Sequence, residues 1–583
     1  MMFKLKSYLR PYLKESILGP FFKLMEAILE LLLPTIVALI INHGIGEKNT
    51  DYVLKMGSLM LIMTILGFGC AMICQYYAAR ASQGFGTSLR NTLFQHIFTF
   101  SHREMDRFGT SSIVNRITND VNQLQVAVAM LIRLVIRAPF ICIGAIIMSM
   151  ILDFRLALIV LASTPIFGIV LYLVITKSSP LYRSYQKKLD QIALVLSENL
   201  SGVRVIRAFA KRRAERQRFH ASSDDVTQTA LKVGRIASLL SPATSFVVNG
   251  TIIIILWASG YHIEAGSLSQ GEVIAFINYV TQILLALIVV SNLVILFTKA
   301  SSSAARINEV LAVQGTIADG ENYTQSKEKE ETPAMTPKIE FKHVSFGYNT
   351  TGDLALQDVS VSIYSGQTIG IIGGTGMGKS TFVNLIPRFY DVSEGQVLVD
   401  GVDVKDYSLV ELRNKMGIVP QKALLFSGTI ADNIRWGNVE ATDEEIELAA
   451  QIAQADEFIS KLPDRYDTML ERGGKNLSGG QKQRLTIARA VVANPEILIL
   501  DDSASALDFA TDAALRQAIS KYSAQSTVLL VSQRVSTVQH ADQIIVFDEG
   551  RIVGIGNHEE LVDTCEVYRE VYVTQQASQG VAG

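Results

Sequence analysis

The first half of the chain is dominated by six long hydrophobic runs, each bounded by polar or charged residues. Each run reaches the roughly 20 residues that an α-helix needs to cross the hydrocarbon core of a bilayer. The pattern therefore predicts six transmembrane helices, at residues 17–42, 53–78, 132–152, 156–176, 240–262 and 272–299.

The gaps between these runs differ in length and in charge. The gaps after the first, third and fifth runs are short, and their only basic residues are Lys48 and Arg155. The two long gaps hold seven Arg within residues 80–137 and thirteen Lys or Arg within residues 177–235. By the positive-inside rule, the long gaps and both termini are expected to face the cytoplasm.

Helical spacing of apolar residues continues through both long gaps, so the helices should extend well into the cytoplasm. Residues 1–15 alternate apolar side chains with Lys and Arg, which predicts an amphipathic helix at the inner headgroup boundary. We expect a transmembrane domain over 16–313, then a polar linker over 314–338. Residues 339–583 alternate strand-like and helix-like stretches, which predicts an α/β domain with a largely parallel sheet.

The composition agrees with a membrane domain and excludes one class of partner. Of the 583 residues, 49% are hydrophobic and 19% charged, and the formal net charge is -2. Such a balance argues against nucleic acid as a partner, because duplex binding requires a large cationic surface. The four cysteines form no CxxC pair and three lie in apolar runs, so we interpret them as core residues rather than metal ligands or disulfides.

The sharpest local motif is GGTGMGKS at residues 373–380, a G-x-x-x-x-G-K-S phosphate loop between a predicted strand and a predicted helix. Its glycines allow backbone N–H groups to surround phosphate oxygens. Lys379 should reach the β- and γ-phosphates, and the Ser380 hydroxyl should ligate Mg²⁺. Further along the chain, the apolar run ILIL ends in Asp501, a second candidate Mg²⁺ ligand. The sequence therefore predicts ATP and Mg²⁺ as cofactors.

The segment LSGGQ at residues 477–481 resembles the signature motif of ABC transporter ATPases. Other parts of that family's pattern follow: Tyr348 matches the aromatic residue that stacks on adenine, Gln421 the Q-loop glutamine that contacts Mg²⁺, and Ser505-Ala506-Leu507-Asp508 the D-loop. The resemblance covers nearly the whole chain, because six crossings with two long cytoplasmic extensions look like the bacterial multidrug exporter type. It implies an all-α membrane domain of exporter type fused to an α/β P-loop ABC ATPase domain.

The resemblance assigns the nucleotide contacts residue by residue. The metal ligands would be Ser380, Gln421 and Asp501. The nucleotide-binding residues would be Tyr348, Gly373, Gly374, Thr375, Gly376, Met377, Gly378, Lys379, Ser380, Thr381 and Gln421, together with Ser478, Gly479, Gly480 and Gln481 of the signature motif.

In this family two ATPase domains face each other head to tail, and each ATP lies between the phosphate loop of one and the signature motif of the other. The chain carries one set, so the resemblance implies a second chain. Two departures indicate which kind. The general base, normally Glu, is Asp502, whose carboxylate is retracted by roughly 1.5 Å. The switch histidine is replaced by Gln533, which can donate a hydrogen bond but carries no positive charge.

Because a misplacement of about 1 Å can cost on the order of 100-fold in rate, this site should bind ATP better than it hydrolyses it. We interpret the chain as the degenerate-site subunit of a heterodimeric exporter whose partner is a homologous half-transporter. Its intact signature motif would complete the partner's site. Short helices near Gly109–Asn115 and Ser201–Ala208, placed by the resemblance, would relay motion between the domains.

Two acidic residues in the first crossing, Glu26 and Glu30, lie one helical turn apart. Ionisable groups at membrane depth usually face a cavity or a partner. They could form an acidic patch that attracts cationic amphipathic substrates, or they could belong to a Lys23–Glu26 pair or an interhelical ion pair. The sequence leaves both open.

The predicted cargo is a hydrophobic or cationic drug-like compound that is moved outward across the cytoplasmic membrane of a bacterium. Two alternatives remain. One is a homodimeric lipid flippase of the same architecture, which Asp502 and Gln533 disfavour because both sites would be impaired. The other is an ATP-gated channel or a regulatory subunit that does not pump.

Overall fold

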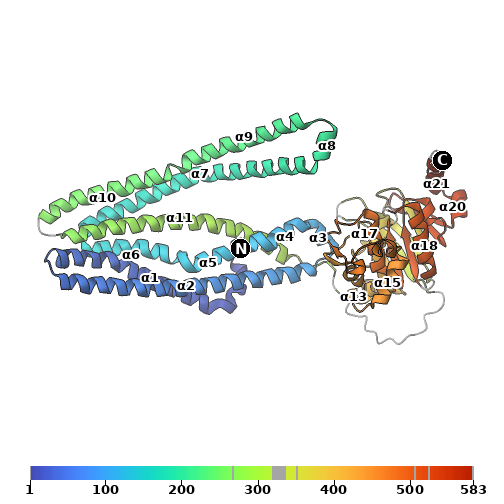
Figure 1. The fold of residues 1–583 in the computed structure, drawn as a ribbon, viewed down its shortest axis with the longest axis horizontal. Helices are drawn as coiled ribbons and strands as arrows, with labels where there is room; N and C mark the ends of the chain where they lie inside the picture. Colours follow the sequence, from blue (N-terminus) through green and yellow to red (C-terminus); the bar gives the residue numbers. More distant parts are fainter. Residues whose placement is uncertain are drawn as a thin grey trace. The chain divides into compact units, whose positions relative to one another are not determined.

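The chain forms two compact units in a computed structural model (Figure 1). The first comprises residues 1–98 and 110–313, and the second residues 99–109 and 314–583. The structure describes residues 2–264, 268–317, 319, 336–348, 352–503, 507–522 and 526–580. Most of the predicted linker therefore lies outside the described residues.

Within its described residues, the first unit holds six helical spans long and apolar enough to cross a membrane, which confirms the prediction from the hydrophobic runs. Three short π-helical segments interrupt the α-helices. In chain order the elements are η1 (Met2–Tyr12), α1 (Leu13–Leu39), η2 (Ile40–Ile45), α2 (Thr50–Phe98), α4 (Thr110–Asn115), η3 (Arg116–Asp120), α5 (Val121–Met130), η4 (Leu131–Val135), α6 (Arg137–Leu152), α7 (Phe154–Ser201), α8 (Val203–Ala208), α9 (Arg212–Ala237), α10 (Leu240–Glu264) and α11 (Gln270–Ala312).

The longest helices greatly exceed a bilayer's thickness. Helix α2 has 49 residues and α7 has 48. At 1.5 Å per residue each is roughly 70 Å long, whereas the hydrocarbon core is about 30 Å thick. The expected extensions beyond the membrane are therefore present. Helices α7 and α9 run side by side, and α8 joins them at one end (Figure 1), where the sequence placed a short helix.

Polar anchors in the first unit tie α1 and η2 to the start of α11. The Tyr279 side chain is fully buried, and its hydroxyl donates to the carbonyl oxygen of Leu31 at 2.9 Å and pairs with the Thr35 hydroxyl at 2.8 Å. A buried phenol needs such partners because an unpaired hydroxyl in an apolar core is costly. Nearby, Asn42 Oδ1 accepts from the backbone N–H of Gly271 at 3.0 Å.

The second unit contains three sheets among its described residues. A six-stranded sheet has the order β12-β11-β3-β10-β9-β6, and its strands are parallel except for the edge strand β12. It consists of β3 (Thr368–Gly373), β6 (Met416–Val419), β9 (Ile497–Asp501), β10 (Thr527–Val531), β11 (Gln543–Asp548) and β12 (Arg551–Gly556). The predicted parallel sheet is confirmed in this part.

A second, four-stranded sheet is antiparallel in the order β2-β1-β4-β5. The largely parallel sheet that the sequence predicts is thus accompanied by an antiparallel sheet that was not predicted separately. Because antiparallel and buried parallel strands share the same apolar residue types, composition alone does not separate them. The strands are β1 (Ile339–Phe346), β2 (Leu356–Ile363), β4 (Glu394–Val399) and β5 (Val402–Asp403), and a two-stranded sheet adds β7 (Gly428–Thr429) and β8 (Met469–Leu470).

The helices of the second unit pack around these sheets in two main hydrophobic clusters. One cluster surrounds the helix after the phosphate loop, and the other surrounds the helix after the signature motif. The elements are α3 (His102–Phe108), α12 (Lys379–Leu385), α13 (Leu409–Asn414), α14 (Ile430–Arg435), α15 (Asp443–Ile452), α16 (Asp456–Ile459), η5 (Arg465–Asp467), α17 (Gly479–Val491), α18 (Phe509–Tyr522), α19 (Val535–Val538), α20 (His558–Thr564) and α21 (Glu566–Gly580).

Two short helices lie near the expected position of the first relay helix. Helix α4 (Thr110–Asn115) matches the expected range Gly109–Asn115 and belongs to the membrane unit, whereas α3 precedes it and belongs with the ATPase unit. Local signals set the bounds of α3. Ser101 and Glu104 form a capping box that starts α3, and Gly109 with φ of +72° ends it.

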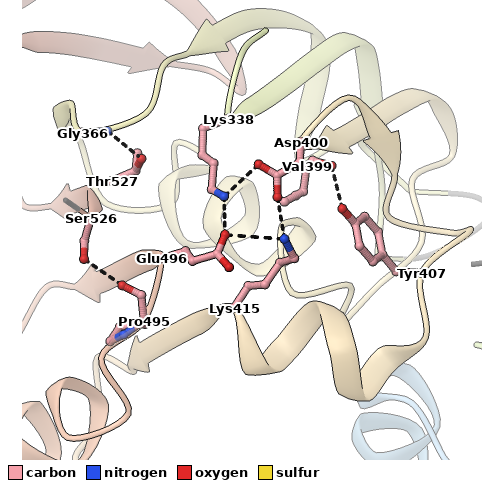
Figure 2. Close-up of polar contacts among 10 residues, drawn as sticks. All are labelled: Lys338, Gly366, Val399, Asp400, Tyr407, Lys415, Pro495, Glu496, Ser526 and Thr527. Carbon is pink, nitrogen blue, oxygen red and sulfur yellow. Dashed lines mark hydrogen bonds and ion pairs between the residues drawn. The ribbon is translucent and has the colours of Figure 1, made fainter. Parts of the chain in front are cut away.

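Four charged side chains connect the two larger sheets (Figure 2). Lys338 precedes β1, Asp400 follows β4, Lys415 precedes β6 and Glu496 precedes β9. Each lysine lies 2.7 Å from one oxygen of Asp400, and both also contact Glu496. Burial raises the pKa of Asp400, but hydrogen bonds from the two lysines outweigh it and hold this pKa below its ordinary value. The cluster therefore fixes the antiparallel sheet against the parallel one.

Candidate nucleotide site

The phosphate loop joins β3 to α12 and depends on glycine at two positions. Gly373 has φ of +155° and Gly378 has φ of +95°, a region that L side chains rarely adopt. A Cβ on Gly373 would lie 2.3 Å from the carbonyl oxygen of Phe547, and one on Gly378 would lie 2.7 Å from that of Ala355. Close approach of neighbouring backbone thus requires glycine at both ends of the loop, as the motif predicts.

Lys379 begins α12 and folds back over the loop. Its ammonium donates to the carbonyl oxygens of Gly373 at 2.9 Å and Gly374 at 2.5 Å. Burial lowers the pKa of Lys379, while the carboxylates of Asp501 and Asp502 oppose this shift. The ammonium is therefore held at the phosphate loop by short contacts that a phosphate oxygen could replace.

Ser380 and Asp501 meet beside the loop, as the sequence predicted for a metal pair. The Ser380 hydroxyl donates to Asp501 Oδ1 at 3.0 Å, and Asp501 is 8% exposed at the end of β9. Burial raises the pKa of Asp501, and the neighbouring Asp502 adds to this effect. A bound cation would offset both the burial of the Asp501 carboxylate and its repulsion by Asp502. A hydroxyl together with a carboxylate is a set of oxygen ligands that suits Mg²⁺.

The described residues contain no group of three or more His, Cys, Asp or Glu that could hold a metal ion by itself. Mg²⁺ is usually bound through one or two carboxylates together with substrate phosphates, and Asp501 beside the Ser380 hydroxyl supplies one such carboxylate. The residues present therefore fit a metal that arrives with the nucleotide.

The two unusual positions lie at this same site. Asp502 has φ of +47°, and its carboxylate accepts a hydrogen bond from the Gln421 amide at 3.4 Å. Within the loop, the Thr375 hydroxyl donates to Gln533 Oε1 at 3.4 Å. The structure thus brings together Gln421, Asp502, Gln533 and the phosphate loop, which are far apart in the sequence.

Tyr348 lies at the edge of the site with one part of its ring open. Its hydroxyl pairs with the Thr381 hydroxyl at 2.9 Å, and its ring packs edge-on against Phe346 and Tyr390 at 5.0 and 5.3 Å. The residue is 43% exposed, which leaves ring surface on which an adenine could stack.

Tyr390 extends this aromatic group to α3, a contact that sequence reasoning missed. The Tyr390 hydroxyl donates to Asp106 Oδ2 at 3.0 Å. The His102 ring lies 4.5 Å from the Phe389 ring. Helix α3 is thereby attached both to Tyr390, which contacts Tyr348, and to the adjacent residue Phe389.

The signature motif caps the start of α17. Ser478 donates its backbone N–H to Gln481 Oε1 at 2.9 Å, and its hydroxyl accepts from the Gln481 backbone at 3.3 Å. These described hydrogen bonds are internal to the first turn and none joins the motif to the phosphate loop. A Cβ on Gly479 would meet no atom within 4 Å. Nothing in the described part of this chain thus requires glycine there.

Sequence reasoning also missed the contacts that join the signature helix to the segment after β6. Arg489 on α17 donates to the carbonyl oxygens of Leu424 and Asn433 at 2.9 and 2.8 Å. Gln483 donates to that of Pro420 at 3.5 Å, next to Gln421. Helix α17 is therefore hydrogen-bonded to the segment that carries the Q-loop glutamine. In the predicted D-loop, Ser505 and Ala506 lie outside the described residues.

In the membrane unit, both acidic residues of the first crossing are ion-paired. The Lys23 ammonium lies 2.6 Å from Glu26, within α1. The Arg137 guanidinium of α6 lies 2.6 Å from Glu30. These contacts correspond to the paired alternative that the sequence left open.

A membrane domain of six long helices, fused to a phosphate-loop ATPase domain that carries a signature motif, defines a half-transporter. Two family models match the chain: the ABC transporter transmembrane region over residues 16–287 and ABC transporter over residues 356–505. The chain belongs to the ABC transporter family. It is an exporter-type ATPase-coupled transporter whose ATPase domain binds ATP, and this half-transporter architecture implies a dimer in a membrane.

The chain is similar to known members along nearly its whole length. It is 39% identical to the uncharacterized ABC transporter ATP-binding protein YfiB of Bacillus subtilis over 99% of both chains. The ATP-dependent lipid A-core flippase of Hahella chejuensis is 33% identical over 89% of this chain and 88% of its own. The putative multidrug export protein YgaD of Bacillus subtilis is 31% identical over 99% of both. A solved bacterial Atm1-family ABC exporter with ATP bound matches 97% of this chain and 99% of its own, with a TM-score of 0.78 and 25% identity.

Proposed function

We propose that the chain is the degenerate-site subunit of a heterodimeric exporter. The observation that carries the proposal is that Asp502 and Gln533 both contact the nucleotide site, Asp502 through Gln421 and Gln533 through Thr375. Both departures from the family pattern, Asp502 in place of Glu and Gln533 in place of His, would therefore act on the same bound ATP. The binding residues of the site are intact, so binding and hydrolysis would be affected differently.

The binding part of the site would work as follows. Lys379 would exchange its loop carbonyls for β- and γ-phosphate oxygens. Ser380 and Asp501, which are already hydrogen-bonded, would hold Mg²⁺ with help from Gln421. Tyr348 would stack on adenine. The bound Mg²⁺ supplies charge stabilisation to the phosphates.

The hydrolytic part would be weak for two physical reasons. The Asp502 carboxylate is one methylene too short to hold the attacking water where a glutamate would, and proton abstraction depends on geometry within hydrogen-bond reach. The Gln533 amide is neutral, so it stabilises charge on the γ-phosphate less than a protonated histidine would. The intact binding residues do not compensate, because contacts that hold ATP equally well before and during the reaction do not lower the barrier to hydrolysis.

The signature motif would serve the partner's site. Ser478 and the N-terminus of α17 present hydrogen-bond donors, and the open space at the Gly479 Cβ position leaves room for a γ-phosphate bound to another chain. A homologous half-transporter with a complete base and switch would then hydrolyse ATP in that site. ATP binding would close the ATPase dimer, and hydrolysis in the partner's site would reset it.

For cargo, we propose a hydrophobic or cationic drug-like compound moved outward across a bacterial cytoplasmic membrane, with the ATPase domain and both termini in the cytoplasm. The relative named as a multidrug exporter supports this class. Because Glu26 and Glu30 are paired with Lys23 and Arg137, they would attract a cation only if it displaced those partners. The acidic patch stays a prediction.

The second candidate is a homodimeric lipid flippase, which the relative named as a lipid A-core flippase favours. The ATPase rate of the chain purified alone separates the two. We expect little activity alone and full activity in a complex with a co-purified homologous chain. A homodimer that hydrolyses ATP at the rate of a full transporter would contradict the heterodimer. Dye uptake into inside-out vesicles separates a pump from an ATP-gated channel or regulatory subunit.

A further inference from the structure

Helix α21 makes a two-point contact with the loop that holds the switch position. Gln575 Oε1 accepts from the backbone N–H of Val535 at 2.8 Å, and Gln575 Nε2 donates to the carbonyl oxygen of Gln533 at 2.7 Å. One amide side chain thus satisfies a backbone donor and a backbone acceptor two residues apart. Both distances are those of good hydrogen bonds.

The helix that carries Gln575 is held by its own packing. Tyr568, two turns earlier on α21, is fully buried in one cluster with Val535, Val538 and Leu561. Its hydroxyl also pairs with His558 Nδ1 at 2.7 Å. Packing of α21 therefore helps to place Gln575 beside the switch loop, in addition to the two hydrogen bonds that it makes.

The contact continues to the phosphate loop through the Gln533 side chain. Gln575 holds the backbone of Gln533, while the Gln533 amide oxygen accepts from Thr375. A fixed backbone restricts the directions in which a side chain can point. We infer that Gln575 is a positioning residue, which holds the switch loop so that the Gln533 amide faces the γ-phosphate of ATP bound at this site.

This inference rests on the proposed function, in which Gln533 takes the place of the switch histidine. Gln575→Ala removes both hydrogen bonds and so frees the Gln533 backbone from this restraint. The hydrogen bond from the Gln533 amide to the γ-phosphate would then be lost. Loss of one neutral hydrogen bond changes an equilibrium about fivefold, so ATP should be retained at this site for about one fifth of the normal time. Gln575→Glu keeps the acceptor for Val535 but sets an oxygen against the Gln533 carbonyl, so it should also shorten retention.

The neighbouring Gln576 provides a matched control on the same helix. It is exposed, and its amide donates to the Tyr572 hydroxyl at 2.5 Å rather than to the switch loop. Gln576→Ala should leave retention unchanged. Thermal unfolding of each variant in the complex shows whether the ATPase domain stays folded.

The test uses the full-length chain in its purified complex, loaded with radiolabelled MgATP and then diluted into unlabelled MgATP. The time course of retained ATP is compared for Gln575→Ala in the unmodified chain and in Gln533→Ala. If Gln575 acts through Gln533, its substitution shortens retention in the first background and has no further effect in the second.

An equal effect in both backgrounds, or unchanged retention after Gln575→Ala, would overturn the inference. The proposed function fails separately, if the unmodified complex releases ATP from both sites equally fast. In that case the same pair of backgrounds is compared by ATPase rate. Coupling between positions 575 and 533 in that rate supports the positioning role, and strict additivity refutes it.

Discussion

Substituting Glu for Asp502 and His for Gln533 gives this site the base and the switch residue that a competent ABC site is expected to have. The surrounding residues need no change, because Lys379, Ser380 and Asp501 already lie together at the phosphate loop. If only these two positions limit the reaction, the substitutions should raise hydrolysis at this site.

The structure allows a rough estimate of the gain. One added methylene moves the carboxylate by roughly 1.5 Å, and a misplacement of about 1 Å costs on the order of 100-fold. Asp502 has φ of +47°, a conformation that Asp tolerates and that costs most other residues about 1 kcal/mol or more. If Glu at this position pays that strain, the expected gain in hydrolysis rate is reduced by a factor of about five. We therefore expect hydrolysis at this site to rise by about 10- to 100-fold.

The assay must first silence the partner's site. Ser478→Ala in this chain weakens that site, because the signature motif is proposed to complete it. The residual ATPase rate of the complex is then measured with and without the two restoring substitutions. Adding Lys379→Ala should abolish any gain, since it removes a phosphate contact of this site alone. A restored variant no faster than Ser478→Ala by itself would refute the reasoning.

Three further predictions concern other parts of the chain. Ser478→Ala should reduce the ATPase rate of the complex more than Asp502→Ala does, and the reverse order would show that the two sites are assigned the wrong way round. Asp400→Asn should destabilise the ATPase domain by about 2 kcal/mol, because it removes the charge of one of the two carboxylates that both half-buried lysines share and leaves them only Glu496. Faster hydrogen exchange in β1 and β6 would show it, and unchanged exchange would contradict it. Since the pKa of Asp400 is lowered, its stabilisation is present above its ordinary value of 3.8 and is lost as pH falls through the folded value. Tyr390→Phe removes the hydrogen bond to Asp106 but keeps the ring beside Tyr348, so ATP affinity should hold while transport-coupled turnover falls by about five- to tenfold; a loss of affinity would contradict this role.

The sequence predicts those features that depend on local pattern. The six crossings follow from runs of about 20 apolar residues, because an unsatisfied backbone cannot lie in hydrocarbon and must form a helix. The phosphate loop follows from glycines that the backbone needs, as the positive φ angles of Gly373 and Gly378 show. In both cases the cause lies within one short segment.

Features that join distant segments were not predictable. The Glu30–Arg137 pair spans 107 residues, and the contact of Gln575 with Gln533 spans 42. A glutamine on an amphipathic helix carries no sign that its amide pairs with backbone elsewhere. Helix α3 was not predicted for a related reason: its capping box fixes where the helix starts, but only packing against Phe389 and Tyr390 shows which domain it joins.

The central claim is that this chain's own site binds ATP and hydrolyses it poorly. The most direct measurement is the nucleotide content of the complex after a single turnover with radiolabelled MgATP. The account predicts that about half of the bound nucleotide stays as ATP, and that Lys379→Ala in this chain removes this retained fraction. Conversion of all bound nucleotide to ADP at one rate would contradict it.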